Sequence, residues 1–408
     1  MLDDKIMVTK LRILYRHLDP GQSGAVSSFV KMIEGYCERF PDDDLTVMCT
    51  ERSPLAKLGR LSNCHVEIVG KKVPREAYLL GAGDIAVWRL NRIRRFDVFW
   101  TVNVGLYTRG QVPQVLMVNN SHQVYPSESS VPHPSIKLRL LLLRQCFRRS
   151  LRLSSGVIVQ TPLMKQCVRQ IRGCPTRVVV LPKAVVAENN SSEHVLSMRV
   201  MQHVSKANAI PKLLFVATAV PHKNHKILAQ MMKSFRQKDS AVRLFVTITR
   251  DEWQSLAGNS AVDLVESEHV IPLGWVDKDE LGALYEACDA CVMPSLLESL
   301  SSAHLEAMHW KIPQVVADLP YAHDLCGNSA LYADPHDGAA WCRQVERLLG
   351  DTSLREQLVK NGAVRLSMVP RSWGEMAVGI REVLSAVAAE YASSRESVLR
   401  SRCREERG

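Results

Sequence analysis

Short apolar segments alternate with amphipathic stretches along this chain, and the alternation constrains the fold more than any other feature. The first apolar segments are 11–15 and 45–49. Between them, roughly from Ala25 to Arg39, apolar residues recur at helical spacing. Further segments follow at 97–101, 115–118, 155–159 and 177–181. Strands that alternate with helices favour an α/β fold with a parallel, doubly wound sheet.

The same alternation starts again in the second half of the chain. Apolar segments occur there at 212–217, 242–247, 270–271, 291–293 and 314–316. A chain of 408 residues is expected to form two domains. The predicted organisation is an N-terminal domain over 1–186, a polar linker over 187–211, a C-terminal domain over 212–370, a long helix over 371–390 and a charged tail over 391–408.

Composition narrows the class of protein. Hydrophobic residues make up 46% of the chain, enough for packed cores. No apolar run approaches the ~18 residues that span a bilayer, and the N-terminus lacks a signal-peptide pattern. The 11 cysteines are scattered without framework spacing, which favours a reducing cytoplasm. Cys288 and Cys291 form the one close pair, and we interpret them as buried small residues rather than zinc ligands.

The charge is uneven along the chain. Residues 1–186 hold 28 basic and 14 acidic residues, a net charge of +14, whereas the rest of the chain has a net charge of −4. Residues 137–153 carry six of the basic residues and no acid. This segment predicts a helix that docks on an anionic membrane through Lys137, Arg144, Arg148 and Arg152; the alternative is an exposed, merely solvated face. Nothing resembles an aromatic-studded surface for nucleic acid, so nucleic acid is not an expected partner.

Two glutamates eight positions apart, Glu298 and Glu306, predict a binding site. Glu298 follows a short buried strand, and the amides of residues 300–303 lie near the start of a predicted helix. Open α/β sheets bind ligands at that edge, and amides at a helix start favour phosphate. A ligand with phosphate in the middle and hydroxyls at both ends, a nucleotide sugar, fits this pattern. The alternative is a surface helix with two solvated glutamates.

These residues resemble the donor-site signature of retaining glycosyltransferases of family four, which have the GT-B fold. In that signature two glutamates separated by seven residues precede Ala-Met, a short turn, a proline and an apolar strand. The corresponding residues here are Glu298, Glu306, Ala307, Met308, Pro313 and 315–317. The stretch 325–335 and the Lys-Asn turn at Lys223 and Asn224 extend the resemblance, which covers roughly residues 11–390.

The resemblance implies two Rossmann-like domains facing across a cleft, with the C-terminal helix crossing back to the N-terminal domain. It implies transfer of a sugar from a nucleoside diphosphate sugar to an acceptor hydroxyl with retention of configuration. The acceptor would be a glycan or lipid-linked glycan, as in lipopolysaccharide or exopolysaccharide assembly. No metal and no other cofactor is expected. The enzyme would be cytoplasmic, with possible peripheral contact to the inner face of the plasma membrane.

Each site residue has a role implied by the resemblance. Glu306 would hold the ribose, Glu298 would contact the donor sugar, and His122 would line the reaction centre from the N-terminal domain. Lys223 and the amides near Leu300 would hold the diphosphate. The remaining donor-binding residues implied are Gly21 and Gly24 in a glycine-containing loop, Thr218, Asn224, Ser301 and Ser302.

The chain departs from the family pattern at three places. Thr218 stands where many relatives have a phosphate-binding arginine, Ser301 or Ser302 replaces a glycine, and Lys311 replaces another. Two other hypotheses about the function therefore stay open. One is a nucleotide-sugar epimerase on the same fold, and the other is a non-catalytic nucleotide-sugar or membrane-binding protein with a degenerate site.

Overall fold

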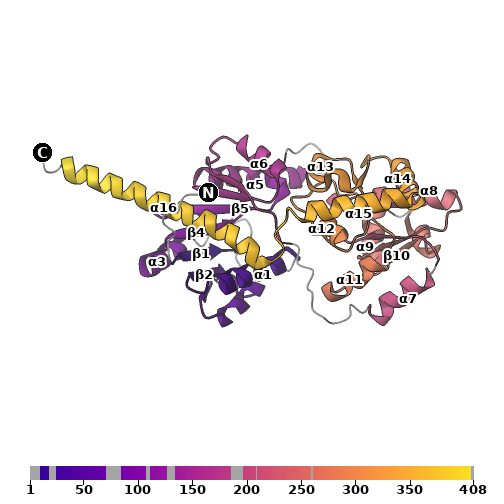
Figure 1. Cartoon of the computed structure of the whole chain (residues 1–408), viewed down its shortest axis with the longest axis horizontal. Coiled ribbons are helices and arrows are strands. Elements are labelled where there is room, and N and C mark those ends of the chain that lie inside the picture. Colours follow the sequence, from indigo (N-terminus) through magenta and orange to yellow (C-terminus); the bar gives the residue numbers. More distant parts are fainter. Residues whose placement is uncertain are drawn as a thin grey trace. The chain divides into compact units, whose positions relative to one another are not determined.

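The computed structural model describes residues 10–17, 24–69, 84–106, 111–125, 134–184, 196–207, 209–258 and 261–405. They divide into two compact α/β units, coloured by sequence in Figure 1. Unit 1 comprises Met1–Pro126, Val131–Ala184 and Pro370–Gly408, and unit 2 comprises Ser127–Ser130 and Val185–Val369. The last segment of the chain therefore belongs to the same unit as the first.

Unit 1 is built on a seven-stranded parallel sheet with the order β3-β2-β1-β4-β5-β6-β7. β1 pairs with both β2 and β4, so Leu14 lies opposite Thr46 on one side and Phe99 on the other. The strands are β1 (Arg12–Arg16), β2 (Asp44–Cys49), β3 (Cys64–Ile68), β4 (Val98–Val102), β5 (Gln114–Val118), β6 (Gly156–Val159) and β7 (Val178–Val180).

Two helices distant in sequence, α1 and α16, share the main core of unit 1 with the sheet. Met376, Ile380 and Leu384 of α16 are buried in one cluster with residues of α1, β1, β2 and β4. Gly35 of α1 allows the close approach, because a Cβ there would lie 2.6 Å from the Cβ of Trp373. The helices of unit 1 are α1 (Gly24–Arg39), η1 (Pro54–Arg60), α3 (Asp84–Arg94), α4 (Ser121–Val124), α5 (Pro134–Arg152), α6 (Pro162–Arg169) and α16 (Trp373–Glu405).

Unit 2 has a six-stranded parallel sheet with the order β10-β9-β8-β11-β12-β13. Its strands are β8 (Lys212–Phe215), β9 (Arg243–Val246), β10 (Val270–Pro272), β11 (Ala290–Met293), β12 (Gln314–Ala317) and β13 (Leu331–Ala333). Its helices are α7 (Met198–Lys206), η3 (Pro221–Lys223), α8 (His225–Gln237), α9 (Arg250–Ala257), α10 (Val262–Glu266), α11 (Lys278–Glu286), α12 (Ser302–His309), α13 (Pro320–Cys326), η5 (Gly327–Ser329), α14 (Gly338–Gly350) and α15 (Thr352–Leu366).

The direction of winding reverses once in each sheet. In unit 1 the reversal lies between β1 and β4, and in unit 2 it lies between β8 and β11. The loops that leave two such strands diverge to opposite faces of the sheet, which opens a crevice at their carboxyl ends where α/β proteins bind ligands. The strand order thus marks one candidate position for a site in each unit.

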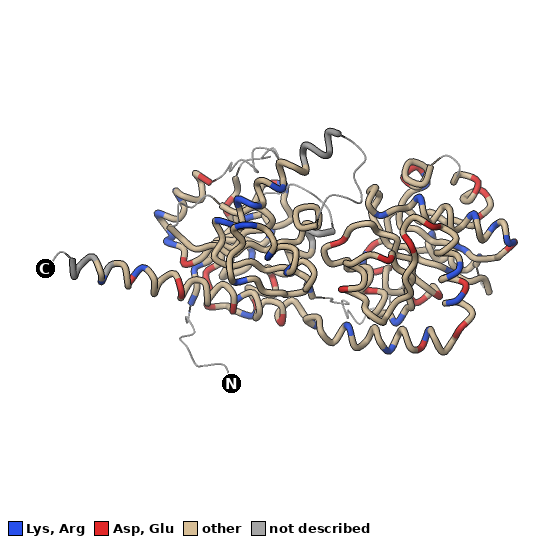
Figure 2. The backbone as a smooth tube through the Cα atoms, turned by 90° about the horizontal axis from the view of Figure 1, so that it is seen from above, with Lys and Arg blue, Asp and Glu red and all other residues tan. Residues whose placement is uncertain are grey.

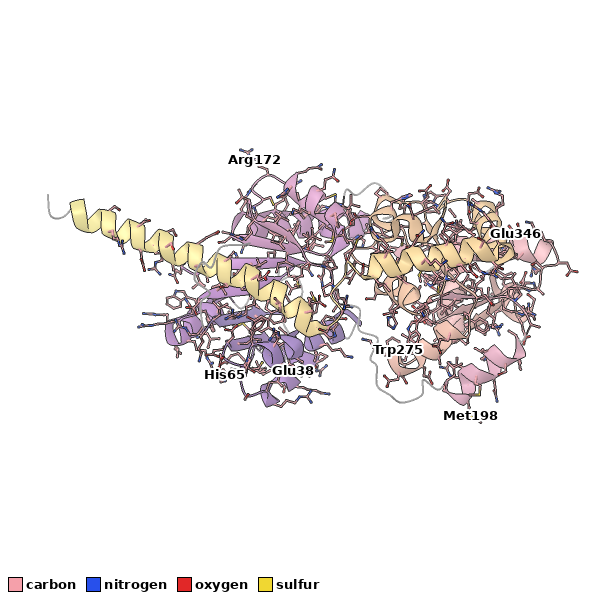
Figure 3. The ribbon with its side chains drawn as sticks, in the orientation of Figure 1. Glu38, His65, Arg172, Met198, Trp275 and Glu346 are labelled. Atoms are coloured by element: carbon pink, nitrogen blue, oxygen red, sulfur yellow. The ribbon has the colours of Figure 1, made fainter. Side chains whose placement is uncertain are left out.

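The predicted α/β fold with parallel sheets is confirmed, although some elements were not predicted. β3 and β13 were not predicted; both are edge strands, and β13 has only three residues. The predicted linker contains α7. This helix packs on unit 2, where the amide of Ser197 donates to Glu280 at 2.8 Å and Arg199 donates to the carbonyl of Trp275 at 2.9 Å. Figure 3 labels Trp275 and Met198 in this region.

The described part of the expected charged tail over 391–408 continues the long helix. α16 continues to Glu405, and the described side chains after residue 391 are exposed. An ion pair between Glu396 and Arg400, one helical turn apart with an N···O distance of 3.7 Å, stabilises this part of the helix. Among the described residues, no helix has both the length and the apolar character needed to cross a bilayer.

Lys311 stands at a position where the family pattern has glycine, and its backbone conformation shows what this substitution costs. Its φ is +58°, in the left-handed region, directly after α12. A residue with a Cβ costs about 1–2 kcal/mol there, although glycine loses part of that advantage through its freedom in the unfolded chain. We expect Lys311→Gly to raise the free energy of unfolding by about 0.5–1 kcal/mol in urea titrations.

The matched control for that substitution is Lys360→Gly. Lys360 is exposed within α15, so the same exchange of residue types occurs in ordinary helical backbone. It should lower the free energy of unfolding by about 1 kcal/mol. Equal effects of the two substitutions would contradict the assignment of strain to Lys311.

Candidate functional site

The loops that follow β8 and β11 meet at the reversal point of the unit 2 sheet. The loop after β8 forms η3, and the loop after β11 runs from Pro294 to Ser301. The amide of Leu296 donates to the carbonyl of His222 at 2.7 Å, which fixes one loop against the other. Side chains from both loops are therefore held at the position where the strand order predicts a ligand.

Lys223 and Glu298 form an ion pair between these two loops. The Lys223 ammonium donates to Oε1 of Glu298, and the two side chains are only 16% and 12% exposed. Burial by itself would raise the pKa of Glu298, but attraction to Lys223 and the hydrogen bond from it outweigh that effect and lower the pKa. Glu298 is therefore a carboxylate at neutral pH, and the pair places a fixed cation beside a hydrogen-bond acceptor.

His304 of α12 lies behind this pair and is neutral. Its ring is fully buried and packs edge-on against Tyr321, with ring centroids 6.2 Å apart. Burial lowers the pKa of His304 to about 4, with Glu298 opposing and Lys223 adding to the shift. Neither ring nitrogen has a hydrogen-bond partner among the described residues. An uncharged ring leaves Lys223 as the cation that balances Glu298.

Glu306 is oriented by a tyrosine that sequence reasoning missed. The hydroxyl of Tyr285, on α11, donates to Oε2 of Glu306 at 3.1 Å. Tyr285 is fully buried, whereas Glu306 is half-buried. Burial first, and then the negative charge of Glu306, raise the pKa of Tyr285, so its phenol stays protonated as a donor. One oxygen of Glu306 is engaged, and the carboxylate is held in a defined orientation.

The remaining predicted donor-site residues of unit 2 lie in the same group of loops. Asn224 has φ +56°, and its side-chain amide donates to the carbonyl of Pro335 at 2.9 Å, which ties the Lys-Asn turn to the loop after β13. Thr218 is exposed in the loop after β8. Leu300 and Ser301 precede α12, and Ser302 is its first residue; the side chain of Ser301 makes no capping hydrogen bond. The first amides of α12 are thus not capped by Ser301.

His122 belongs to unit 1, in the short helix α4 after β5. Its position is set by Asn103, whose Oδ1 accepts from the amides of Asn119 and Asn120 at 3.0 and 3.2 Å. Burial first, and then Arg144, lower the pKa of His122, so the ring is neutral at pH 7. Gly24 is the first residue of α1, and Gly21 lies outside the described residues.

Arg144 makes contacts that the sequence did not predict. The sequence places it on a membrane-docking face, but its guanidinium donates to the carbonyls of His122 and Tyr125 at 3.3 and 2.6 Å. The side chain therefore holds α4, which carries His122, and the residue that follows α4. The sequence could not show this, because helical periodicity identifies a face of a helix but not the carbonyls that lie opposite it.

Residues 201–365 match the family model described as "Glycosyl transferases group 1". This segment is therefore similar to glycosyltransferases of that group. It contains Lys223, Glu298, Glu306 and the strands that carry them. An O-antigen chain mannosyltransferase of Salmonella typhimurium is 26% identical over 192 residues, which cover 46% of this chain and 53% of that protein. A D-inositol 3-phosphate glycosyltransferase of Salinispora arenicola is 30% identical over 192 residues, 43% of this chain and 41% of the relative.

The alignments thus span about half the length of these curated relatives or less. Together with the family match, they support the prediction of a glycosyltransferase enzyme.

Solved structures resemble nearly the whole chain. Sucrose-phosphate synthase from Thermosynechococcus elongatus has a TM-score of 0.66 at 16% identity, covering 93% of this chain and 100% of that one. Anabaena Alr3699/HepE, in complex with UDP and glucose, has a TM-score of 0.64 at 16% identity, covering 92% and 100%. At this identity the likeness concerns the fold, and it confirms the predicted GT-B class.

Proposed function

We propose that this protein transfers a sugar from a nucleoside diphosphate sugar to an acceptor hydroxyl with retention of anomeric configuration, in the manner of family-four glycosyltransferases. The observation that carries the proposal is the Lys223–Glu298 pair at the reversal point of the unit 2 sheet. Beside it stands Glu306, held by Tyr285. A fixed cation, an ionised acceptor and an oriented carboxylate suit a diphosphate flanked by a sugar and a ribose.

The chemistry assigns a separate part of the donor to each group. The bond from the anomeric carbon to the diphosphate oxygen breaks, and a bond from that carbon to the acceptor oxygen forms on the same face. The Lys223 ammonium and the first amides of α12 stabilise the charge that develops on the leaving diphosphate. Glu298 accepts hydrogen bonds from the sugar hydroxyls. The acceptor proton passes to the leaving phosphate oxygen. The proposal requires no metal and no other cofactor.

The proposed acceptor is a glycan or a lipid-linked glycan, as in lipopolysaccharide or exopolysaccharide assembly. The similarity to an O-antigen chain mannosyltransferase supports this choice, as does the net charge of +14 over residues 1–186. A lipid-linked acceptor lies on a membrane, so we place the enzyme in the cytoplasm and on the inner face of the plasma membrane. Anionic lipid is then the expected counterpart of the basic first half.

Loss of the Glu306 carboxylate should weaken binding of the free nucleoside diphosphate as well as of the sugar nucleotide. A thermal-shift screen of UDP, GDP and ADP identifies the base, because ligand at 100 times its dissociation constant adds about 2.7 kcal/mol. Hydrogen bonds to a charged group contribute about 1.5–3 kcal/mol, so Glu306→Ala should weaken the selected diphosphate by roughly 10-fold or more in calorimetry. Equal affinity of variant and wild type would overturn the ribose assignment.

Removal of the Tyr285 hydroxyl should have a smaller effect that depends on the ribose. We expect Tyr285→Phe to weaken the diphosphate by about five-fold, the usual scale of one hydrogen bond. The variant should show no such loss with the 2′,3′-dideoxy analogue, which lacks the hydroxyls that Glu306 would bind. Tyr332→Phe is the matched control, since the Tyr332 hydroxyl donates to the carbonyl of Gly327 at 2.5 Å rather than to Glu306. A loss of equal size for both ligands would assign Tyr285 a purely structural role.

Incubation with the sugar nucleotide alone separates transfer from epimerisation. A transferase releases nucleoside diphosphate only slowly without an acceptor, whereas an epimerase converts the donor at its full rate. Rapid conversion of the free donor to an epimer would contradict the proposed function.

A further inference from the structure

α3 presents an exposed face that is rich in large apolar side chains. Ile85, Trp88 and Ile93 are 71%, 46% and 80% exposed. The opposite side of the helix is covered, because Val87 is buried and Leu90 packs on the same core cluster. The exposed side chains therefore lie on the face of α3 that points away from the core. Figure 1 shows α3 at the edge of unit 1.

The same face carries an unbalanced positive charge. Residues 85–96 contain four arginines and no acid. Three of these, Arg89, Arg92 and Arg95, are exposed, and Arg92 lies over the Trp88 ring at 4.8 Å.

The nearby acids are already paired with other arginines. Asp84 pairs with Arg16 at 2.6 Å, Glu67 with Arg94 at 3.8 Å, and Asp97 with Arg12 at 3.0 Å. The charge of the exposed arginines is therefore not cancelled by these acids, and Figure 2 marks the basic and acidic positions along the backbone.

Comparison with α5 favours α3 as the membrane-contacting helix. On α5 the arginine at position 144 is engaged with the carbonyls of α4 and the residue after it. Its exposed apolar residues, Leu141 and Leu142, are 55% and 56% exposed. Exposed arginines at positions 148 and 152 remain, but the exposed part of α5 includes no aromatic residue among its described side chains. α3 combines tryptophan, isoleucine and arginine on one exposed face.

We propose that α3 docks unit 1 on an anionic lipid bilayer. Trp88, Ile85 and Ile93 enter the boundary between headgroups and acyl chains, where tryptophan is enriched and apolar surface leaves water. Arg89, Arg92 and Arg95 meet anionic headgroups. The proposal deepens the proposed peripheral location of the enzyme and rests on it, but it does not depend on glycosyl transfer. An anionic bilayer can accept both the arginines and the exposed apolar side chains. A neutral protein groove could accept only the apolar side chains.

The experiment measures partitioning of the full-length chain onto liposomes of phosphatidylcholine with one quarter phosphatidylglycerol. Arg89→Gln/Arg92→Gln should weaken partitioning by about 30-fold, since each arginine contributes about 1 kcal/mol near an anionic leaflet. Arg148→Gln/Arg152→Gln is the matched control, with two exposed arginines removed from α5 of the same unit. That control should change partitioning by less than about three-fold, the effect of a change in net charge alone.

A second variant tests insertion of the apolar residues. Trp88→Ser/Ile93→Ser keeps every charge and should abolish sedimentation even at low salt. Brominated lipids should quench part of the tryptophan emission of wild type on liposomes, and Trp88→Phe should remove that quenching while the protein still binds.

Three results would overturn the proposal. Wild type could fail to bind anionic liposomes, the α5 control could lose binding as strongly as the α3 pair, or neutral liposomes could bind equally well. Failure of the proposed function would look different: the wild type would bind no nucleoside diphosphate, while the liposome results stood unchanged. Circular dichroism and thermal unfolding confirm that each variant is folded, so a loss of binding reports on the surface of α3.

Discussion

Lys223→Met should reduce turnover by at least about 100-fold, the usual loss when a preorganised charge-stabilising group is removed from an active site. Thr218 offers no charge where many relatives place an arginine, and His304 is neutral because its pKa is about 4. Lys223 is a cation that its ion pair with Glu298 holds in place at this site. The measurement is release of nucleoside diphosphate from the donor that wild type binds.

The double variant Lys223→Met/Glu298→Gln separates catalysis from folding. Lys223→Met alone leaves Glu298, only 12% exposed, without its cation, and this lowers stability. Neutralising Glu298 as well should restore much of the thermal stability but none of the turnover. Near-normal turnover in the single variant would show that another group stabilises the leaving diphosphate.

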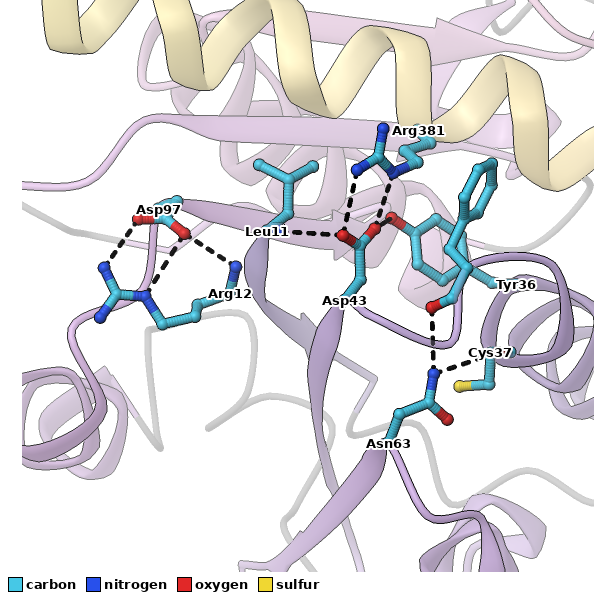
Figure 4. A network of polar contacts seen from close by, with 9 residues as sticks. Leu11, Arg12, Tyr36, Cys37, Asp43, Asn63, Asp97 and Arg381 are labelled. Carbon is cyan, nitrogen blue, oxygen red and sulfur yellow. Dashed lines mark hydrogen bonds and ion pairs between the residues drawn. The ribbon is translucent and has the colours of Figure 1, made fainter. Parts of the chain in front are cut away.

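Arg381→Met should lower the free energy of unfolding by about 3–5 kcal/mol, the cost of breaking a buried ion pair by removing one partner. Arg381 of α16 donates to both oxygens of Asp43, at 2.8 and 3.1 Å, and its side chain is 10% exposed. Asp43 also accepts from the amide of Leu11 and the hydroxyl of Tyr36 (Figure 4). The substitution leaves a buried carboxylate with two neutral donors. Urea titration measures the change.

Glu390→Gln is the matched control, because Arg177 and Glu390 also join the body of unit 1 to α16. Glu390 is 64% exposed, so removal of this pair should cost less than about 1 kcal/mol. In a double-mutant cycle, Asp43→Asn should cost much less in the Arg381→Met background than in wild type. Equal costs for the buried and the exposed pair would contradict the assignment of stability to Asp43 and Arg381.

The sequence predicted those features that depend on short-range pattern. Apolar periodicity identified most strands and the helix that became α1 to within a residue or two. The sequence placed Glu298 just after a short buried strand, and the structure has it in the loop between β11 and α12. Lys223 and Glu298 were assigned to one site by resemblance, although 75 residues separate them.

Contacts between distant segments were not predictable from pattern. In the sequence, Tyr285 occupies a position of α11 that the apolar pattern assigns to the core. Its hydroxyl comes within hydrogen-bond distance of Glu306 only in the folded chain. The spacing of Arg144 predicts a position on a solvated helix face. In the structure its guanidinium donates hydrogen bonds to the carbonyls of His122 in α4 and of Tyr125 just after it. β13 was missed because three residues give too weak a periodicity, and α7 was missed because it lies inside a polar segment that was interpreted as a linker.

The contribution of α16 to unit 1 affects how the chain folds during synthesis. Arg381 and Asp43 are 338 positions apart, and the core of unit 1 includes Met376, Ile380 and Leu384. At about 5–20 residues per second, the ribosome takes on the order of 10–40 s to pass from the end of β7 to α16. Residues 185–369 of unit 2 are synthesised during that interval. Unit 1 therefore completes its core only after residues 185–369 have been synthesised, and the faces of α1, β4 and β5 that α16 covers stay open to chaperones until α16 has emerged.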